Sequence, residues 1–237
     1  MMINKIGTNL KDIETPELII DLDILDANVN TVSKAYSDSH LKMRAHTKNL
    51  KSPYLARRQV EAGGSNGGVC TAKVSEAEVM VEGGFDNILI ANQVVSDDKI
   101  ERLCSLAKFA DMKVGIDNID NLNNLSKFAI KHNVILGVLV EINTSMFRCG
   151  VRSSSHAVEL AKRAVDLEGI IFKGVMSHQS IKGYTTEEER WKIGEEYLDI
   201  CLESKRAIEE AGMDVEIVST GETFTFDIVL KYPEITE

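Results

Sequence analysis

Short apolar runs, rich in branched residues, alternate along this chain with longer amphipathic stretches, and this alternation constrains the fold more than any other feature. Most of the runs are apolar at consecutive positions, which is typical of strands buried on both faces. The predicted strands are Glu17–Asp23, Met43–Lys48, Gly67–Ala72, Asn87–Asn92, Met112–Asp117, Ile135–Asn143, Phe172–His178 and Val215–Gly221. The predicted helices are Ser75–Gly83, Asp97–Ala110, Asn118–His132, Ser153–Asp166 and Thr186–Ala211. Repeated strand–helix units require parallel strands joined by helical crossovers.

Two architectures fit this pattern, an open doubly wound sheet and a closed (β/α)8 barrel of the TIM type. No GxGxxG or GxxxxGK[ST] motif follows any predicted strand, which disfavours the nucleotide-binding form of the open sheet. The chain has only 3 prolines and no low-complexity linker, so residues 1–237 are expected to form one domain. The sequence therefore favours a barrel.

The composition excludes several classes of protein. Hydrophobic residues make up 43% of the chain and charged residues 27%, which excludes disordered and fibrous chains. The net charge is −10 with no basic cluster, so neither nucleic acid nor a membrane surface is expected as a partner. The N-terminal residues contain no apolar stretch of the kind found in secretory signals. The four cysteines form no CxxC pair and are expected to be reduced thiols of a cytoplasmic protein.

Polar residues gather at the predicted carboxyl ends of the strands. In a barrel of parallel strands, these ends face the mouth of the active site. The residues at these positions are His46, Lys48, Cys70, Thr71, Asn92, Asp117, Glu141, Asn143, His178, Ser219, Thr220 and Gly221. A single polar residue at a strand end is common, but the whole set predicts a polar mouth above an apolar body.

The strand predicted to end at Lys48 carries three basic side chains on one face. Alternation along a strand places Arg44, His46 and Lys48 on the same side at successive heights. Such cations repel one another, and a lysine that is desolvated beside other cations becomes a nucleophile for Schiff-base formation. The alternative is a basic strand edge on which Lys48 is solvated. Lys51 is a competing nucleophile, although it falls beyond the strand.

Five stretches of the chain, in order, resemble one family of enzymes. Arg44–Gln59 is similar to the RPHxKTHK…P.IARRQ signature of the D-threonine aldolase and D-serine dehydratase family. The other matching stretches are Leu22-Asp23 with Asn28, Lys73–Glu78, Ile88–Val95, and Val140–Asn143 running to Arg148–Val151. That family consists of fold-type III pyridoxal phosphate enzymes whose barrel is related to the N-terminal barrel of alanine racemases. The chain departs from the signature at Ala45, where the family has proline, and at Leu50, where it has a second histidine.

The resemblance implies roles for individual side chains. Lys48 would form the Schiff base with pyridoxal phosphate, and Arg148 would point at the cofactor's phenolate oxygen, where a fixed cation is stabilising. His178 would lie against the cofactor ring, and either His46 or His178 would be available for proton transfer. Without the resemblance, Arg148 is equally consistent with a surface arginine at a loop-to-helix junction, and His178 with a hydrogen-bonded core histidine.

Residues 219–223 resemble the phosphate-binding loop that follows the seventh barrel strand in that family. Backbone N–H groups at a helix N-terminus and hydroxyl donors suit a dianionic phosphate. The residues expected to bind it are Ser219, Thr220, Gly221 and Thr223. Glu222 stands where the wider family commonly has glycine, and its negative charge lowers phosphate affinity unless the side chain turns away. A Ser-Thr-Gly sequence also caps ordinary helices, so the assignment depends on the position of this loop in the chain.

The resemblance implies a lyase that acts on a β-hydroxy D-amino acid. It would be a D-threonine aldolase-like enzyme that uses pyridoxal phosphate to release glycine and an aldehyde. The alternatives are a non-catalytic pyridoxal phosphate carrier, an inactive fragment, a D-serine dehydratase and an amino-acid racemase. Arg44–Gln59 and Lys73–Glu78 look like the aldolase family and not like the carriers. Racemisation would need a second base from a further domain.

The end of the chain predicts that the barrel is incomplete at its last strand. Residues 233–237 resemble the lead-in to that strand, and the C-terminal β-domain of the family is not among the 237 residues. In the family that domain carries a divalent metal site, so Mn or Zn is expected only with it, and no metal ligands are assigned within residues 1–237. The resemblance implies a homodimer for the full-length form.

Overall fold

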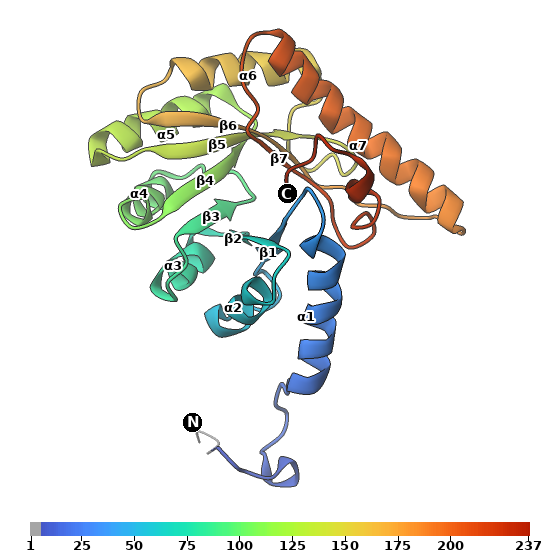
Figure 1. The fold of residues 1–237 in the computed structure, drawn as a ribbon. Coiled ribbons are helices and arrows are strands. Elements are labelled where there is room, and N and C mark those ends of the chain that lie inside the picture. Colours follow the sequence, from blue (N-terminus) through green and yellow to red (C-terminus); the bar gives the residue numbers. More distant parts are fainter. Residues whose placement is uncertain (1–5) are drawn as a thin grey trace.

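A computed structural model describes residues 6–237 and leaves residues 1–5 undescribed. The prediction that the N-terminus carries no secretory signal therefore falls partly on residues outside the described range. Seven strands form one parallel sheet, and each strand pairs with its neighbours in the sequence. The sheet curls on itself, and helices cover its outer face (Figure 1). This architecture is the predicted incomplete barrel of the TIM type.

Most of the predicted elements are confirmed, with small shifts at their ends. The strands are β1 (Met43–His46), β2 (Ser65–Thr71), β3 (Asn87–Ile90), β4 (Asp111–Ile116), β5 (Leu136–Ile142), β6 (Ile170–Ser177) and β7 (Ile217–Ser219). The helices are α1 (Leu22–Ser37), α2 (Pro53–Glu61), α3 (Val74–Glu82), α4 (Asp97–Leu106), α5 (Ile119–His132), α6 (Ser154–Asp166) and α7 (Glu187–Glu210). Two short 3₁₀ helices are η1 (Leu10–Asp12) and η2 (Val229–Lys231).

Side-chain caps explain why several helices begin where they do. The Asn118 side chain accepts two backbone N–H groups of the first turn of α5. Thr186 and Glu189 form a reciprocal capping box at the start of α7. Each cap gives a partner to N–H groups that a helix cannot satisfy internally. Among the helices of residues 6–237, none is long and apolar enough to cross a membrane.

The predicted strand Glu17–Asp23 is wrong. The Asp21 side chain accepts backbone N–H groups of the following turn, so Leu22 begins helix α1 instead of continuing a strand. The segment before α1 extends away from the barrel (Figure 1). Its apolar side chains, including Leu18 and Ile19, are exposed and therefore belong to no strand of the sheet.

The last residues of the chain bridge the first and last strands. The backbone N–H groups of Thr236 and Glu237 both donate to the Val218 carbonyl oxygen of β7 over 3.2 Å. On the other side, the Lys42 N–H donates to the Thr236 carbonyl oxygen over 3.2 Å, just before β1 begins. This short segment therefore lies where an eighth barrel strand would start, as the sequence predicts.

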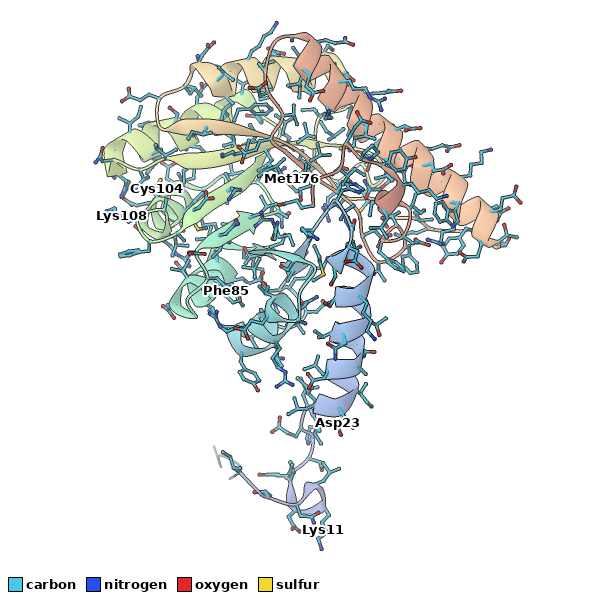
Figure 2. All side chains as sticks on the ribbon, in the orientation of Figure 1. Lys11, Asp23, Phe85, Cys104, Lys108 and Met176 are labelled. Atoms are coloured by element: carbon cyan, nitrogen blue, oxygen red, sulfur yellow. The ribbon has the colours of Figure 1, made fainter. Side chains whose placement is uncertain are left out.

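The apolar core has two parts. The larger part lies between the sheet and the helices. The smaller part lies inside the curled sheet and consists of Leu89, Leu139, Met176 and Ile217. Met176 appears near the middle of the molecule in Figure 2. Because these side chains fill the interior, we expect a ligand to bind at the open carboxyl ends of the strands.

Candidate active site

Lys48 and His46 lie at the carboxyl end of β1. The strand ends at His46, so Lys48 stands in the turn that follows, which corrects the predicted strand Met43–Lys48. The His46 Nδ1 atom accepts the Lys48 backbone N–H over 3.3 Å and helps to fix this turn. The Thr47 hydroxyl and N–H both donate to the Cys70 carbonyl oxygen of β2, over 3.1 and 2.8 Å. The Lys48 side chain is exposed, which agrees with the alternative of a solvated lysine at the strand edge and not with a desolvated one.

Arg44 shares a face of β1 with His46 but adds no net charge to the site. Its Nε and Nη2 atoms donate to the two carboxylate oxygens of Glu237 over 2.6 and 2.7 Å. The two side chains are only 5% and 6% exposed. The Arg44 Nη1 atom also donates to Asn87 Oδ1 over 2.9 Å. The prediction of three mutually repelling cations is therefore wrong for Arg44, because a buried carboxylate neutralises it.

Lys48 and Lys51, the two candidate nucleophiles, differ in their partners. Lys51 Nζ donates to Glu76 Oε1 over 2.6 Å, and Glu76 Oε2 accepts the Ala72 backbone N–H over 2.8 Å. Within residues 6–237, no carboxylate forms an ion pair with Lys48. The amine of Lys51 is therefore engaged, whereas the amine of Lys48 is available.

The two histidines of the predicted site share an electrostatic environment with Lys48. Burial, followed by the charge of Lys48, lowers the pKa of His46 to about 4, and His178 contributes to this lowering. Burial, followed by the charges of Arg148 and Lys48, lowers the pKa of His178. His46, Lys48, Arg148 and His178 stand at or just beyond the carboxyl ends of β1, β5 and β6, and these ends lie at the same edge of the parallel sheet. Both imidazoles are neutral at pH 7, and a neutral imidazole can accept a proton.

Arg148 lies in the loop after β5, beside a buried carboxylate. Glu141 is 3% exposed, and its two oxygens accept Gln93 Nε2 over 2.6 Å and Cys149 Sγ over 2.9 Å. Burial and Glu141 raise the pKa of Cys149 to about 11, so this thiol stays protonated and acts as a donor. Arg148 Nη2 lies 3.8 Å from Glu141 Oε1, and the arginine side chain is 48% exposed. The Glu141 carboxylate anchors this arginine loosely and leaves it open to an anionic ligand.

Gln179 joins the end of β6 to the loop after β7, and the sequence analysis did not identify it. Its side chain is fully buried. Its Nε2 atom donates to Ser177 Oγ over 2.8 Å and to Thr220 Oγ1 over 2.5 Å, and its Oε1 atom accepts the Gly221 N–H over 2.8 Å. The Ser177 and Thr220 hydroxyls are 2.6 Å apart. The only signal in the sequence is that Gln179 directly follows His178 at a strand end.

The predicted phosphate loop begins where Ser219 ends β7, and three of its backbone N–H groups already have partners within the protein. The Thr220 N–H donates to the Glu237 carbonyl oxygen over 3.0 Å. The Gly221 N–H donates to Gln179, and the Glu222 N–H donates to Thr225 Oγ1 over 2.9 Å. Thr223 is exposed at the tip of the loop. The N–H groups of Thr223 and Phe224 are therefore those that the loop's internal bonds leave for a ligand.

The turn of this loop depends on glycine at position 221. Gly221 has φ +103°, a conformation that residues with a Cβ rarely adopt. A Cβ atom there would also lie 3.2 Å from a Val229 methyl group. The Glu222 side chain does not extend into solvent: its Oε1 atom is buried without a hydrogen-bond partner among the described residues, and burial raises its pKa. Within residues 6–237, no three His, Cys, Asp or Glu side chains are grouped so that they could hold a metal ion.

Comparison with known proteins places this site in a family. The chain matches the family model "Alanine racemase, N-terminal domain" over residues 20–228. A 3-hydroxy-D-aspartate aldolase from Paracoccus denitrificans (strain Pd 1222) is 36% identical over 224 residues, which cover 93% of this chain and 57% of the relative. A D-threonine aldolase from Arthrobacter sp is 34% identical over 219 residues, which cover 92% of this chain and 57% of the relative.

The solved structures agree with this assignment. The crystal structure of D-threonine aldolase from Filomicrobium marinum has a TM-score of 0.89 and 35% sequence identity, over 94% of this chain and 60% of that chain. The chain thus spans 57% of the length of the two curated relatives. The predicted fold and the predicted kinship with alanine racemases are both confirmed. The chain belongs to the alanine racemase N-terminal domain family.

Proposed function

We propose that this chain binds pyridoxal phosphate through Lys48 and forms the barrel of a lyase that cleaves β-hydroxy D-amino acids. The observation that supports the proposal is that Lys48, His46, His178 and Arg148 all stand at or just beyond the carboxyl ends of β1, β5 and β6, at one edge of the parallel sheet. The relatives described above as a 3-hydroxy-D-aspartate aldolase and a D-threonine aldolase support this substrate class.

The residues at the mouth fit the three reactive parts of pyridoxal phosphate. Lys48, whose amine forms no ion pair among the described residues, would take the aldehyde carbon. Arg148, exposed and only loosely anchored, would face the phenolate oxygen. His178, at the end of β6, would lie against the ring.

The loop after β7 fits the phosphate. The Ser219 and Thr220 hydroxyls and the backbone of Gly221 and Thr223 would line the phosphate site. The observation that tests this fit is Glu222 Oε1, which is buried without a hydrogen-bond partner among the described residues. Burial has the largest effect on this carboxyl group and raises its pKa, which reduces the negative charge that a phosphate in the loop would meet.

Pyridoxal phosphate, when bound, supplies an electron sink for the bond that breaks beside the amino-bearing carbon. The protein side chains must then hold and move protons. The His46 Nδ1 atom accepts the Lys48 N–H, so in the neutral ring the proton is on Nε2. The Cys70 backbone also interacts with the His46 ring and favours its protonated form. His178 is therefore the histidine that is free to accept a proton from the substrate, and His46 positions Lys48.

The test is a lyase assay with pyridoxal phosphate, using D-threonine and 3-hydroxy-D-aspartate as substrates, with and without added Mn²⁺. We expect glycine release that Lys48→Ala abolishes and that Lys51→Ala, the matched lysine control, retains. Attachment of the cofactor to Lys48 with no turnover of either substrate would contradict the lyase and favour a cofactor carrier. Equal activity in the Lys48→Ala variant would contradict the assignment of the lysine.

A further inference from the structure

Cys149 directly follows Arg148 in the loop after β5, and its thiol contacts two charged side chains. The other three cysteines of the chain are buried, whereas Cys149 is only partly buried. Its Sγ atom donates to Glu141 Oε1 over 2.9 Å. The same Sγ atom accepts the Arg148 Nε–H over 3.4 Å. The thiol therefore lies between a carboxylate and a guanidinium, as a donor to the first and an acceptor from the second.

Glu141 offers the thiol an acceptor that is fixed in place. It is 3% exposed, and its second oxygen accepts Gln93 Nε2 over 2.6 Å. Gln93 stands just beyond the carboxyl end of β3, two strands away from Glu141 on β5. Because a donor holds each oxygen, the carboxylate cannot turn without leaving a buried polar group unpaired. Glu141 therefore fixes the direction in which the Cys149 thiol donates.

The backbone next to Cys149 is held as well. The Gly150 N–H donates to Asp117 Oδ2 over 2.8 Å, and the Val151 N–H donates to the Glu141 carbonyl oxygen over 2.8 Å. Gly150 has φ +91°, and a Cβ atom there would lie only 3.0 Å from the Glu141 carbonyl oxygen. The loop thus returns closely to β5 and keeps Cys149 beside Glu141.

The Arg148 side chain, in contrast, has few contacts of its own. It is 48% exposed, and its Nη2 atom lies 3.8 Å from Glu141 Oε1, which is too far for a hydrogen bond. Within residues 6–237, no hydrogen bond holds the Arg148 side chain except the one to Cys149 Sγ. The thiol is therefore the contact that limits the directions the guanidinium can take.

The Cys149 thiol stays protonated at neutral pH. Burial, followed by the hydrogen bond to Glu141, raises its pKa to about 11. A protonated thiol can donate and accept at the same time, whereas a thiolate would add a second negative charge beside Glu141. A serine hydroxyl has the same capacity as the thiol, and an alanine methyl group has none of it.

We propose that Cys149 is a positioning residue, whose thiol bridges the Glu141 carboxylate and the Arg148 guanidinium and so holds the guanidinium at the mouth of the barrel. This inference rests on the proposed function only for what Arg148 meets there, the phenolate oxygen of pyridoxal phosphate. Its consequence is that the order of the Arg148 side chain depends on a group at position 149 that both donates and accepts. Serine should preserve that order, and alanine should not.

The first measurement needs no cofactor. The ¹⁵N heteronuclear NOE of the Arg148 Nε–H group reports how ordered the guanidinium is, in the wild-type chain, Cys149→Ser and Cys149→Ala. We expect an ordered signal in the wild-type chain and in Cys149→Ser, and a mobile one in Cys149→Ala. Cys104→Ala is the matched control, because it removes a fully buried thiol from α4, away from the loop (Figure 2). It should leave the Arg148 signal unchanged.

The second measurement is the dissociation constant of pyridoxal phosphate, taken by calorimetry. Cys149→Ala should weaken binding about fivefold, as expected for the loss of one hydrogen bond, and Cys149→Ser should bind nearly as the wild-type chain does. In an Arg148→Met background, Cys149→Ala should have no further effect, because the thiol acts through the guanidinium. A residue that merely supports the fold would weaken binding in both backgrounds.

Three results would overturn the inference. One is an Arg148 signal in Cys149→Ala that is as ordered as in the wild-type chain. The second is a Cys149→Ser variant that behaves like Cys149→Ala in both measurements. The third is a loss of affinity in Cys149→Ala that persists in the Arg148→Met background. Failure of the proposed function gives a different result, since pyridoxal phosphate would then bind to none of the chains while the Arg148 signal still distinguished alanine from serine at position 149.

Discussion

Arg44 and Glu237 form a buried, two-pronged ion pair that joins the first strand of the barrel to the last residues of the chain. The donor–acceptor distances are 2.6 and 2.7 Å, and Asn66 Nδ2 donates a third bond to the same carboxylate over 2.6 Å. The backbone bond from Lys42 to Thr236 closes the same seam. Both carboxylate oxygens of this charge-assisted pair accept hydrogen bonds, so the pair fixes the position of strand β1, which Lys48 follows.

The first prediction concerns this pair. Glu237→Gln leaves the Arg44 guanidinium buried without its counter-charge, which should lower the free energy of unfolding by about 3–5 kcal/mol. Urea denaturation measures the loss. Glu216→Gln breaks the pair with Lys173, in which the Glu216 side chain is 63% exposed, and should cost less than about 1 kcal/mol. Equal losses in the two variants would show that the buried pair does not hold the wall together.

The second prediction concerns Gln179. Replacing it with alanine leaves the Gly221 N–H without its buried acceptor and removes the amide donor from the Ser177 and Thr220 hydroxyls, which keep only each other. This should lower the free energy of unfolding by about 1–3 kcal/mol. Gln59→Ala is the control, because the Gln59 amide makes only a weak contact of 3.6 Å to a methionine sulfur. Urea denaturation measures the free energy of unfolding of both variants. An equal loss in Gln59→Ala would contradict the role of Gln179.

The third prediction uses the charge of Lys48. Because that charge is the second cause, after burial, that lowers the pKa of His46 to about 4, Lys48→Met should raise the His46 pKa. The value should stay below 6.5, since the burial of the ring remains. Lys51→Met removes a lysine that is paired with Glu76 and is not among the leading causes of the His46 shift, so it should change this pKa less. Titration of the imidazole resonances by NMR distinguishes the two variants, and an identical pKa in both would contradict the placement of Lys48 beside His46.

The fourth prediction is a pH dependence of stability. The folded chain takes up the His46 proton only near its pKa of about 4, whereas the unfolded chain takes it up near 6.5. Between these values the unfolded state binds more protons, so the free energy of unfolding should fall as the pH is lowered from 6.5 to 4. The lowered pKa of His178 acts in the same direction. His46→Gln should flatten this slope in urea titrations at several pH values, and an unchanged slope would contradict the burial of the ring.

The sequence was sufficient for the strand–helix repeat because buried parallel strands and amphipathic helices have distinct patterns. Ile135–Asn143, for example, was predicted from its continuous apolar run and corresponds to β5. Glu17–Asp23 has the same kind of apolar run. It is not a strand, because Asp21 caps helix α1 and the segment has no neighbouring strand among the described residues. An apolar run does not reveal whether a partner strand exists.

The site was predictable only in part, for a related reason. Lys48, His46 and His178 stand at strand ends, and a parallel barrel brings such ends together. The partner of Arg44 lies 193 residues away, and Gln179 contacts a loop 41 residues away, so neither contact has a local signal.

Reductive labelling of the purified chain tests directly whether Lys48 holds the cofactor. Pyridoxal phosphate is added, the complex is reduced with borohydride, and the labelled peptide is identified by mass spectrometry. We expect a single cofactor-dependent label on Lys48 that is absent from Lys48→Ala and retained in Lys51→Ala. A label on Lys51 or Lys73, or no label on any lysine, would contradict it.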